Sequence, residues 1–241
     1  SFICSKFKYL KNSVSISHKT LNIIDLTKFD KVILLSMPKI YKKKLSKLSF
    51  EKKIFKKIKD KRLIYFSTSQ VYPDKLDNKE NFVKPKSIYA KNKLKIENEI
   101  KKNFKNFLIL RAPIIFKKDN YGKSTFFDIL NKNFKKKKIS FNINENSIRD
   151  LITLDDFFKN YINIDQKNLR GIYNIGSKKG LTVKKIIGYN FKDKIINENI
   201  KIFFAKKISN MTLNIDRLEN KIGKVGKKIH ANVLIELNKW G

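Results

Sequence analysis

The sequence predicts an α/β fold, with a Rossmann-like, doubly wound parallel sheet and a smaller mixed C-terminal part. Short apolar runs rich in β-branched and aromatic residues alternate with longer, lysine-rich amphipathic segments. These runs are apolar on both faces, which is typical of parallel strands covered by helices. Beyond Pro113 the alternation weakens, which indicates a second, smaller lobe.

The elements follow from the apolar pattern and from capping residues. Strands are expected at residues 13–17, 30–36, 63–67, 107–111 and 171–176. A short strand is expected to begin at residue 149 and to be followed directly by a helix. Helices are expected at 1–11, 40–59, 89–104 and 124–134, then from a cap at Thr153 or Asp155, then from Thr182 to 189. The tail at 215–240 is predicted to form two helices broken at 223–226.

The net charge of +35 carries little functional information. Of 56 basic residues only five are arginine, and the lysines cover almost every predicted surface. Readers of nucleic acid use arginine forks clustered on one element, so we expect no specific nucleic-acid partner. No apolar run approaches the roughly 20 residues of a membrane helix, and no secretory leader is visible. We therefore expect a cytoplasmic protein without a membrane partner.

Cysteine and histidine are too scarce for several kinds of site. The chain has one cysteine and two histidines, His18 and His230, far apart in sequence. No metal site and no disulfide framework is expected from this set. Acid and base duties must then fall on tyrosine, lysine and carboxylates.

Two stretches together form a candidate proton-transfer site. The strand at 63–67 runs into Ser67, Thr68 and Ser69, and a predicted helix later carries Tyr89 and Lys93. Residues four apart lie on one face of a helix, one turn apart. A lysine ammonium in that position favours the phenolate and is expected to lower the tyrosine pKa.

Five segments follow one another in a fixed order: residues 67–73, the pair Tyr89 and Lys93, and residues 110–113, 147–156 and 171–176. Together they resemble the extended short-chain dehydrogenase/reductase family, the NAD(P)-dependent nucleotide-sugar epimerases, dehydratases and reductases. Tyr89 and Lys93 match the family's Tyr-x-x-x-Lys. The resemblance implies an NAD(P)-binding domain at 1–112 and a substrate-binding lobe at 113–241, with about 147–163 packing back on the first.

The N-terminal residues resemble the end of the family's glycine-rich loop. Phe2 and Ile3 fall at the start of its first helix, and Cys4 replaces a glycine. We expect the first strand and the start of the phosphate loop to be missing through truncation. No acidic residue ends the strand at 13–17, which favours NADP over NAD, although either cofactor is possible.

The resemblance assigns roles to individual residues. Thr68, Tyr89 and Lys93 would be catalytic, with Lys93 also orienting the nicotinamide ribose. The cofactor-binding residues would be Phe2, Ile3, Asp25, Leu26, Ser36, Tyr89, Lys93 and Pro113. The substrate-binding residues would be Ser69, Gln70 and Arg149, with Arg149 clamping the diphosphate of a nucleotide sugar.

Three functions remain open at this point. Ser69 and Gln70 stand where dehydratases of the family have Asp-Glu, so dehydration is disfavoured, and epimerisation or reduction of a 4-keto sugar is expected. A degenerate, non-catalytic nucleotide-sugar or cofactor-binding protein is the alternative. A basic nucleic-acid-binding protein is the third. A homodimer through the helices at 40–59 and 88–104 is also predicted from the resemblance.

Overall fold

A parallel four-stranded sheet forms the centre of the molecule. The computed structural model describes residues 4–7, 10, 13–16, 24–35, 38–117, 126–127 and 137–239. The spatial order of the strands is β1 (Lys31–Leu34), β2 (Arg62–Thr68), β4 (Phe107–Ala112) and β9 (Gly171–Asn174). All three neighbouring pairs are parallel. The predicted fold class is confirmed.

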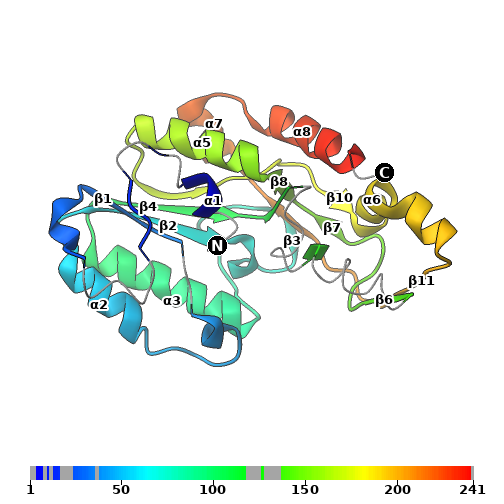
Figure 1. Cartoon of the computed structure of the whole chain (residues 1–241), viewed down its shortest axis with the longest axis horizontal. Coiled ribbons are helices and arrows are strands. Elements are labelled where there is room, and N and C mark those ends of the chain that lie inside the picture. Colours follow the sequence, from blue (N-terminus) through cyan, green and yellow to red (C-terminus); the bar gives the residue numbers. More distant parts are fainter. Residues whose placement is uncertain are drawn as a thin grey trace.

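Helices cover both faces of this sheet (Figure 1). One face carries α2 (Ser49–Lys57) and α3 (Ile88–Asn103), and the other side carries α5 (Leu154–Gln166), α7 (Asp216–Ile222) and α8 (Gly226–Asn238). Strand side chains alternate between the faces. Leu63 and Tyr65 therefore join the apolar layer under α2 and α3, while Ile64 and Phe66 join the layer under α5.

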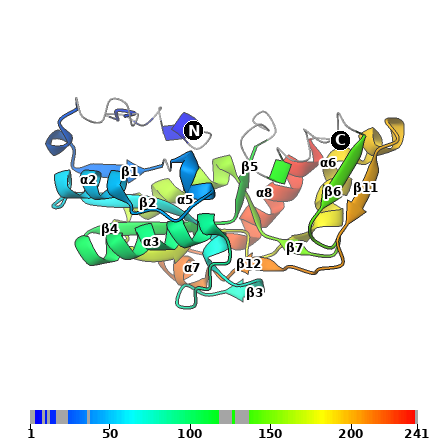
Figure 2. The same ribbon diagram turned by 90° about the horizontal axis from the view of Figure 1, so that it is seen from below.

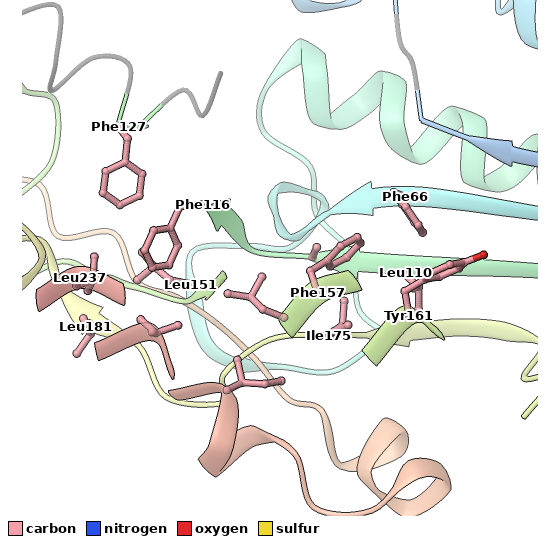
Figure 3. Packing of buried hydrophobic residues seen from close by; sticks show 14 of the residues in the cluster. Phe66, Leu110, Phe116, Phe127, Leu151, Phe157, Tyr161, Ile175, Leu181 and Leu237 are labelled. Carbon is pink, nitrogen blue, oxygen red and sulfur yellow. The ribbon is translucent and has the colours of Figure 1, made fainter. Parts of the chain in front are cut away.

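The larger core lies on the α5 face and is rich in aromatic rings (Figure 3). Phe66 of β2 meets Phe157 of α5 edge-on, with ring centroids 5.0 Å apart. Tyr161, one turn further along α5, contacts the same Phe66 ring at 5.5 Å. Edge-to-face contacts of this kind add to the roughly 1.5–3 kcal/mol that burial of each large apolar side chain contributes. The core thus fixes α5 against the sheet.

Three smaller sheets lie beyond the central one. The largest has the spatial order β10 (Leu181–Thr182), β7 (Ile148–Arg149), β12 (Met211–Leu213) and β3 (Lys75–Asn78). Two strand pairs complete the set: β5 (Ile114–Phe116) with β8 (Leu151–Thr153), and β6 (Lys138–Phe141) with β11 (Lys201–Phe204). Figures 1 and 2 both place β6, β11 and α6 (Val183–Asn197) at the end of the molecule opposite α2.

Short helical turns connect these elements. They are α1 (Cys4–Phe7), η1 (Leu26–Lys28), η2 (Lys39–Lys42) and η3 (Ser69–Val71). Two predicted caps are confirmed: Thr153 accepts a hydrogen bond from Asp156 N, and Thr182 from Lys185 N. The predicted break in the tail is also present, because Gly223 adopts φ +93° between α7 and α8.

Several predicted elements are wrong or incomplete. Residues 13–16 form no strand, since no described strand pairs with them. The helix expected at 40–59 is split into η2 and α2, because Leu48 takes a left-handed conformation with φ +57°. Of the opening helix only α1 lies among the described residues, and most of the helix expected at 124–134 lies outside them. No described helix is long and apolar enough to cross a membrane.

The central sheet takes its last strand from the second half of the chain. β9 begins at residue 171 and pairs with β4, so the chain returns to the first lobe well beyond Pro113. The division into residues 1–112 and 113–241 stays a prediction.

Candidate active site

Thr68 lies at the carboxyl end of β2, where ligands bind in open parallel sheets. Its hydroxyl oxygen accepts a hydrogen bond from Gln70 N at 3.3 Å and so caps η3. The Thr68 side chain is half-buried, which leaves it accessible from the surface. Buried strand residues on one side and the short turn on the other fix its position.

Helix α3 begins beside this strand end. The Ser87 hydroxyl accepts a hydrogen bond from Ala90 N at 3.1 Å and caps the helix. Tyr89, Lys93 and Glu97 then follow one another at intervals of four, so they form one stripe along the helix. Lys93 and Glu97 are buried and Tyr89 is half-buried at the helix start.

The Lys93 ammonium is held by a backbone carbonyl and two aromatic rings. Its Nζ atom donates a hydrogen bond to the Phe66 carbonyl oxygen at 2.7 Å. The same atom lies 4.6 Å from the ring centroid of Tyr65 and 6.0 Å from that of Tyr89. Burial lowers the pKa of Lys93 to about 8, and the carboxylates of Glu97 and Glu51 act against that shift.

Tyr89 and Thr68 interact through their side chains. Burial raises the pKa of the Tyr89 phenol to about 12, while the interaction with Thr68 works in the opposite direction. This shift is opposite to the lowering expected from a lysine neighbour, because burial is the larger effect. The structure thus brings together Thr68, Tyr89 and Lys93, the three residues that the sequence singled out.

The predicted substrate residues next to Thr68 differ in exposure. Ser69 is buried, whereas Gln70 is exposed and its side-chain oxygen accepts a hydrogen bond from the Ser87 hydroxyl at 3.4 Å. Gln70 therefore ties η3 to the start of α3. Neither residue brings a carboxylate to the Tyr89 site.

Arg149 lies on a different sheet and is half-buried. Its guanidinium donates to the Ser209 carbonyl, to the Ser209 hydroxyl at 3.1 Å and to the Ile148 carbonyl at 2.9 Å. Burial lowers the pKa of Arg149, and Asp74 opposes that effect. Its sequence neighbour Asp150 turns elsewhere, accepting hydrogen bonds from Ser177 and Leu213 N.

The predicted cofactor residues are spread over the structure. Asp25 is exposed and accepts hydrogen bonds from Thr27 N at 3.0 Å and from the Thr27 hydroxyl at 2.6 Å. Leu26 is buried in the core under α2 and α3, and Pro113 is half-buried between β4 and β5. Three predicted cofactor residues lie outside the described residues: Phe2, Ile3 and Ser36.

Comparison with known proteins places the fold. Residues 55–145 match the family model of the RmlD substrate binding domain. Among solved structures, a dTDP-glucose 4,6-dehydratase from Bacillus anthracis in complex with NAD has a TM-score of 0.70 and 16% identity, over 92% of this chain and 76% of that one. The chain has the fold of the extended short-chain dehydrogenase/reductases. The family resemblance of the sequence motifs is confirmed at this level.

Two further structures with the short-chain dehydrogenase/reductase fold are similar. A UDP-glucuronic acid 4-epimerase from Bacillus cereus has a TM-score of 0.70 and 19% identity, over 89% of this chain and 76% of that one. A dTDP-4-dehydrorhamnose reductase from Clostridium acetobutylicum has a TM-score of 0.68 and 14% identity, over 99% of this chain and 93% of that one. No curated protein sequence matches the chain.

Sequence reasoning missed the buried charges beside the Tyr89 site. Glu97 continues the stripe of Tyr89 and Lys93, and that spacing could have revealed it. Arg111, one of five arginines, ends an apolar strand and could also have been found. Glu51 lies in a lysine-rich helix and gives no signal in the sequence, yet it is fully buried.

The described surface also holds a cavity of about 390 Å³ between α5 and α8, lined by residues such as Asp156, Asn160 and Lys228. It contains none of the residues of the Tyr89 site, so we do not assign it to the chemistry. Among the described residues no group of three or more potential ligands could hold a metal ion.

Proposed function

We propose that the protein is an NAD(P)-dependent reductase or epimerase that acts on the 4-keto or 4-hydroxyl group of a nucleotide sugar. The convergence of Thr68, Tyr89 and Lys93 at the carboxyl end of β2 carries this proposal. A phenol beside a hydroxyl, with an ammonium 6.0 Å from its ring, can move a proton to or from a sugar oxygen.

The residues present fit the nicotinamide end of such a cofactor. Lys93 uses one of its three N–H groups on the Phe66 carbonyl, so others can reach the ribose hydroxyls. Pro113 lies at the end of the neighbouring strand β4 and would contact the cofactor from that side. A bound nicotinamide would supply or accept the hydride. The name of one solved relative includes NAD and that of another NADPH, so the choice between them stays open, with NADP favoured by the sequence.

The chain's own residues would handle the proton. With a pKa of about 12 the Tyr89 phenol is protonated at neutral pH, which is the form that donates to a carbonyl oxygen being reduced. Thr68 would hold that oxygen by a hydrogen bond. The charge of Lys93 would stabilise the phenolate that remains after proton transfer. This order of events makes ketone reduction the first reaction to test.

The substrate class is supported by the relatives and by the site. A 4-epimerase and a dehydrorhamnose reductase share the fold, and the matching family model describes a substrate binding domain. We propose that Arg149, which Ser209 holds in a half-buried position, binds the diphosphate, and that Ser69 and Gln70 line the sugar site. Because Ser69 and Gln70 carry no carboxylate, dehydration is not proposed.

The assembly and the location are proposals of the same kind. We propose a homodimer through α2 and α3, whose outward residues include Lys52 and Lys91. Their charges make the dimer dependent on salt. We also propose a cytoplasmic location.

The experiment is a turnover assay on the full chain. NADH or NADPH oxidation is followed with dTDP- and UDP-linked 4-keto sugars, and NAD(P) and sugar-nucleotide binding is measured by calorimetry. Thr68→Ser keeps the hydroxyl and should keep turnover, whereas Thr68→Val should lower it at least about tenfold. Binding without turnover in the wild type would favour the non-catalytic alternative.

A further inference from the structure

Four charged side chains lie buried between the central sheet and its covering helices α2 and α3. Glu51 and Glu97 are 0% exposed, Arg111 is 2% exposed and Lys93 is 7% exposed. The surrounding layer is made of apolar side chains such as Leu63 and Ile96. Two negative and two positive charges balance in number, and in such a layer each charge needs a counter-charge.

Glu97 and Arg111 form a complete ion pair. Arg111 Nη2 lies 2.6 Å from Glu97 Oε2, and Arg111 Nε donates to both oxygens at 3.1 and 3.2 Å. The Ser67 hydroxyl donates to Glu97 Oε1. The other terminal nitrogen of Arg111, Nη1, donates to the Tyr72 hydroxyl and to the Glu80 carbonyl, both at 2.8 Å. This pair therefore needs no further partner.

Glu51 is incompletely satisfied. One of its oxygens accepts a hydrogen bond from the Tyr41 hydroxyl at 2.6 Å, while Oε1 has no hydrogen-bond partner. In the part of the chain that the structure describes, no lysine or arginine forms an ion pair with Glu51. A fully buried carboxylate of this kind is costly unless a positive charge lies nearby.

Lys93 is a buried cation that could balance the Glu51 charge. It too forms no ion pair among the described residues, and its ammonium contacts the Phe66 carbonyl and the rings of Tyr65 and Tyr89. The charges of Glu97 and Glu51 raise the Lys93 pKa against the effect of burial. Since Arg111 neutralises Glu97, Glu51 is the carboxylate left to balance Lys93.

Tyr65 packs against Lys93 in the same buried layer. Its ring centroid is 4.6 Å from Lys93 Nζ, and its buried hydroxyl has no hydrogen-bond partner. The pKa of Tyr65 is raised by burial and then by Tyr89, Glu97, Glu51 and Tyr41. The carboxylates that act on Lys93 are Glu97 of α3 and Glu51 of α2.

We propose that Glu51, held by Tyr41, is the buried counter-charge of Lys93 and a positioning residue of the Tyr89–Lys93 pair. The inference rests on the proposed function for its catalytic meaning, since a charged Lys93 is what stabilises the Tyr89 phenolate. Without Glu51, Lys93 gives up its proton at a lower pH and withdraws that support. Glu51 itself touches neither substrate nor cofactor in this account.

A double-mutant cycle tests the pairing without any enzymatic assay. Urea unfolding at pH 7 is measured for the wild type, Glu51→Gln, Lys93→Met and the double variant. Lys93→Met alone leaves Glu51 uncompensated, so adding Glu51→Gln should raise its urea midpoint. Additive effects of the two substitutions, or a further loss in the double variant, would overturn the proposal.

The pH dependence of unfolding gives a second, independent readout. Stability that depends on Lys93 is isolated as the difference between each protein and its Lys93→Met counterpart. Glu51→Gln should move the Lys93 titration to lower pH by about one unit, and Glu51→Asp, which keeps the charge, should restore it. If Lys93 titrates at the same pH in the wild type and in Glu51→Gln, Glu51 is not its counter-charge. If Glu51→Gln does not fold, Glu51→Asp and Tyr41→Phe are compared instead. Tyr41→Phe should then move the Lys93 titration to a lower pH than Glu51→Asp does.

The catalytic consequence is measured separately. In Glu51→Gln, kcat should fall at pH 8 more than at pH 6.5, while the KM for the sugar nucleotide stays within about twofold. An equal fall of kcat at both pH values would refute the positioning role. It would not change the conclusion of the double-mutant cycle. Lack of turnover in every variant, including the wild type, would instead refute the proposed function.

Discussion

The Nζ atom of Lys93 lies 2.7 Å from the carbonyl oxygen of Phe66. Phe66 lies in β2, one residue before Ser67, where the buried part of the strand ends. This bond joins helix α3 to the strand that ends in Thr68. The aromatic core on the opposite face holds Phe66 through Phe157 and Tyr161 (Figure 3). Packing of α5 on one face therefore fixes the position of a charged group on the other.

The low pKa of Lys93 predicts that stability rises with pH. Its pKa is 10.5 in the unfolded chain and about 8 in the folded one, so the unfolded chain binds more protons between these values. The free energy of unfolding should rise by about 3 kcal/mol relative to Lys93→Met as pH increases from about 8 to about 10.5. Urea titrations at pH 7.5, 8.5 and 9.5 measure this. Lys91→Met, an exposed lysine on the same helix, should show no such change, and a flat difference for Lys93→Met would contradict the burial account.

The Glu97–Arg111 pair predicts a large loss on breaking it. Arg111→Met should cost about 3–5 kcal/mol, because it leaves the Glu97 carboxylate buried without a cation. Glu97→Gln combined with Arg111→Met should recover part of that loss. Chemical denaturation of the three variants gives the values. The matched control is Lys86→Met, whose exposed pair with Asp74 should be worth less than about 1 kcal/mol. A similar small cost for Arg111→Met would show that the buried pair is not structural.

Asp150 predicts the opposite pH dependence. Burial raises its pKa to about 6, even though Ser177 and Leu213 donate hydrogen bonds to it. The folded chain therefore binds more protons than the unfolded chain between pH 4 and 6, and stability falls across that range. Relative to Asp150→Asn, the wild type should lose about 3 kcal/mol from pH 4 to pH 6. Thermal or urea unfolding at pH 4, 5 and 6 measures the difference, and a wild type that gains stability over this range would disprove the shift.

Much of the central fold could be predicted from the sequence. Strands β2 and β4 contain uninterrupted apolar runs, β9 lies within the strand expected at 171–176, and the caps of α5 and α6 are Thr153 and Thr182. Tyr89 and Lys93 stand out because they are four residues apart on a predicted helix, and Thr68 because residues 67–73 resemble the family's motif. These signals are local, and local signals survive in a single sequence.

The missed elements depend on contacts far apart in the chain. β3 has three exposed residues in four and pairs with β12, so that Lys75 lies opposite Met211. Nothing near either segment predicts that pairing. The turn at Leu48 was missed because left-handed leucine is rare and carries no glycine signal. The role of Glu51 was missed because its burial depends on where α2 packs, which a lysine-rich sequence does not indicate.

In the proposed reaction Tyr89 moves the proton at the sugar oxygen. The most direct measurement is kcat for NAD(P)H oxidation with a 4-keto sugar nucleotide at pH 7, compared between the wild type and Tyr89→Phe. We predict a loss of at least about 100-fold in Tyr89→Phe, with no loss in Tyr189→Phe, which removes a phenol from α6. Equal turnover by the wild type and Tyr89→Phe would contradict the proposed mechanism.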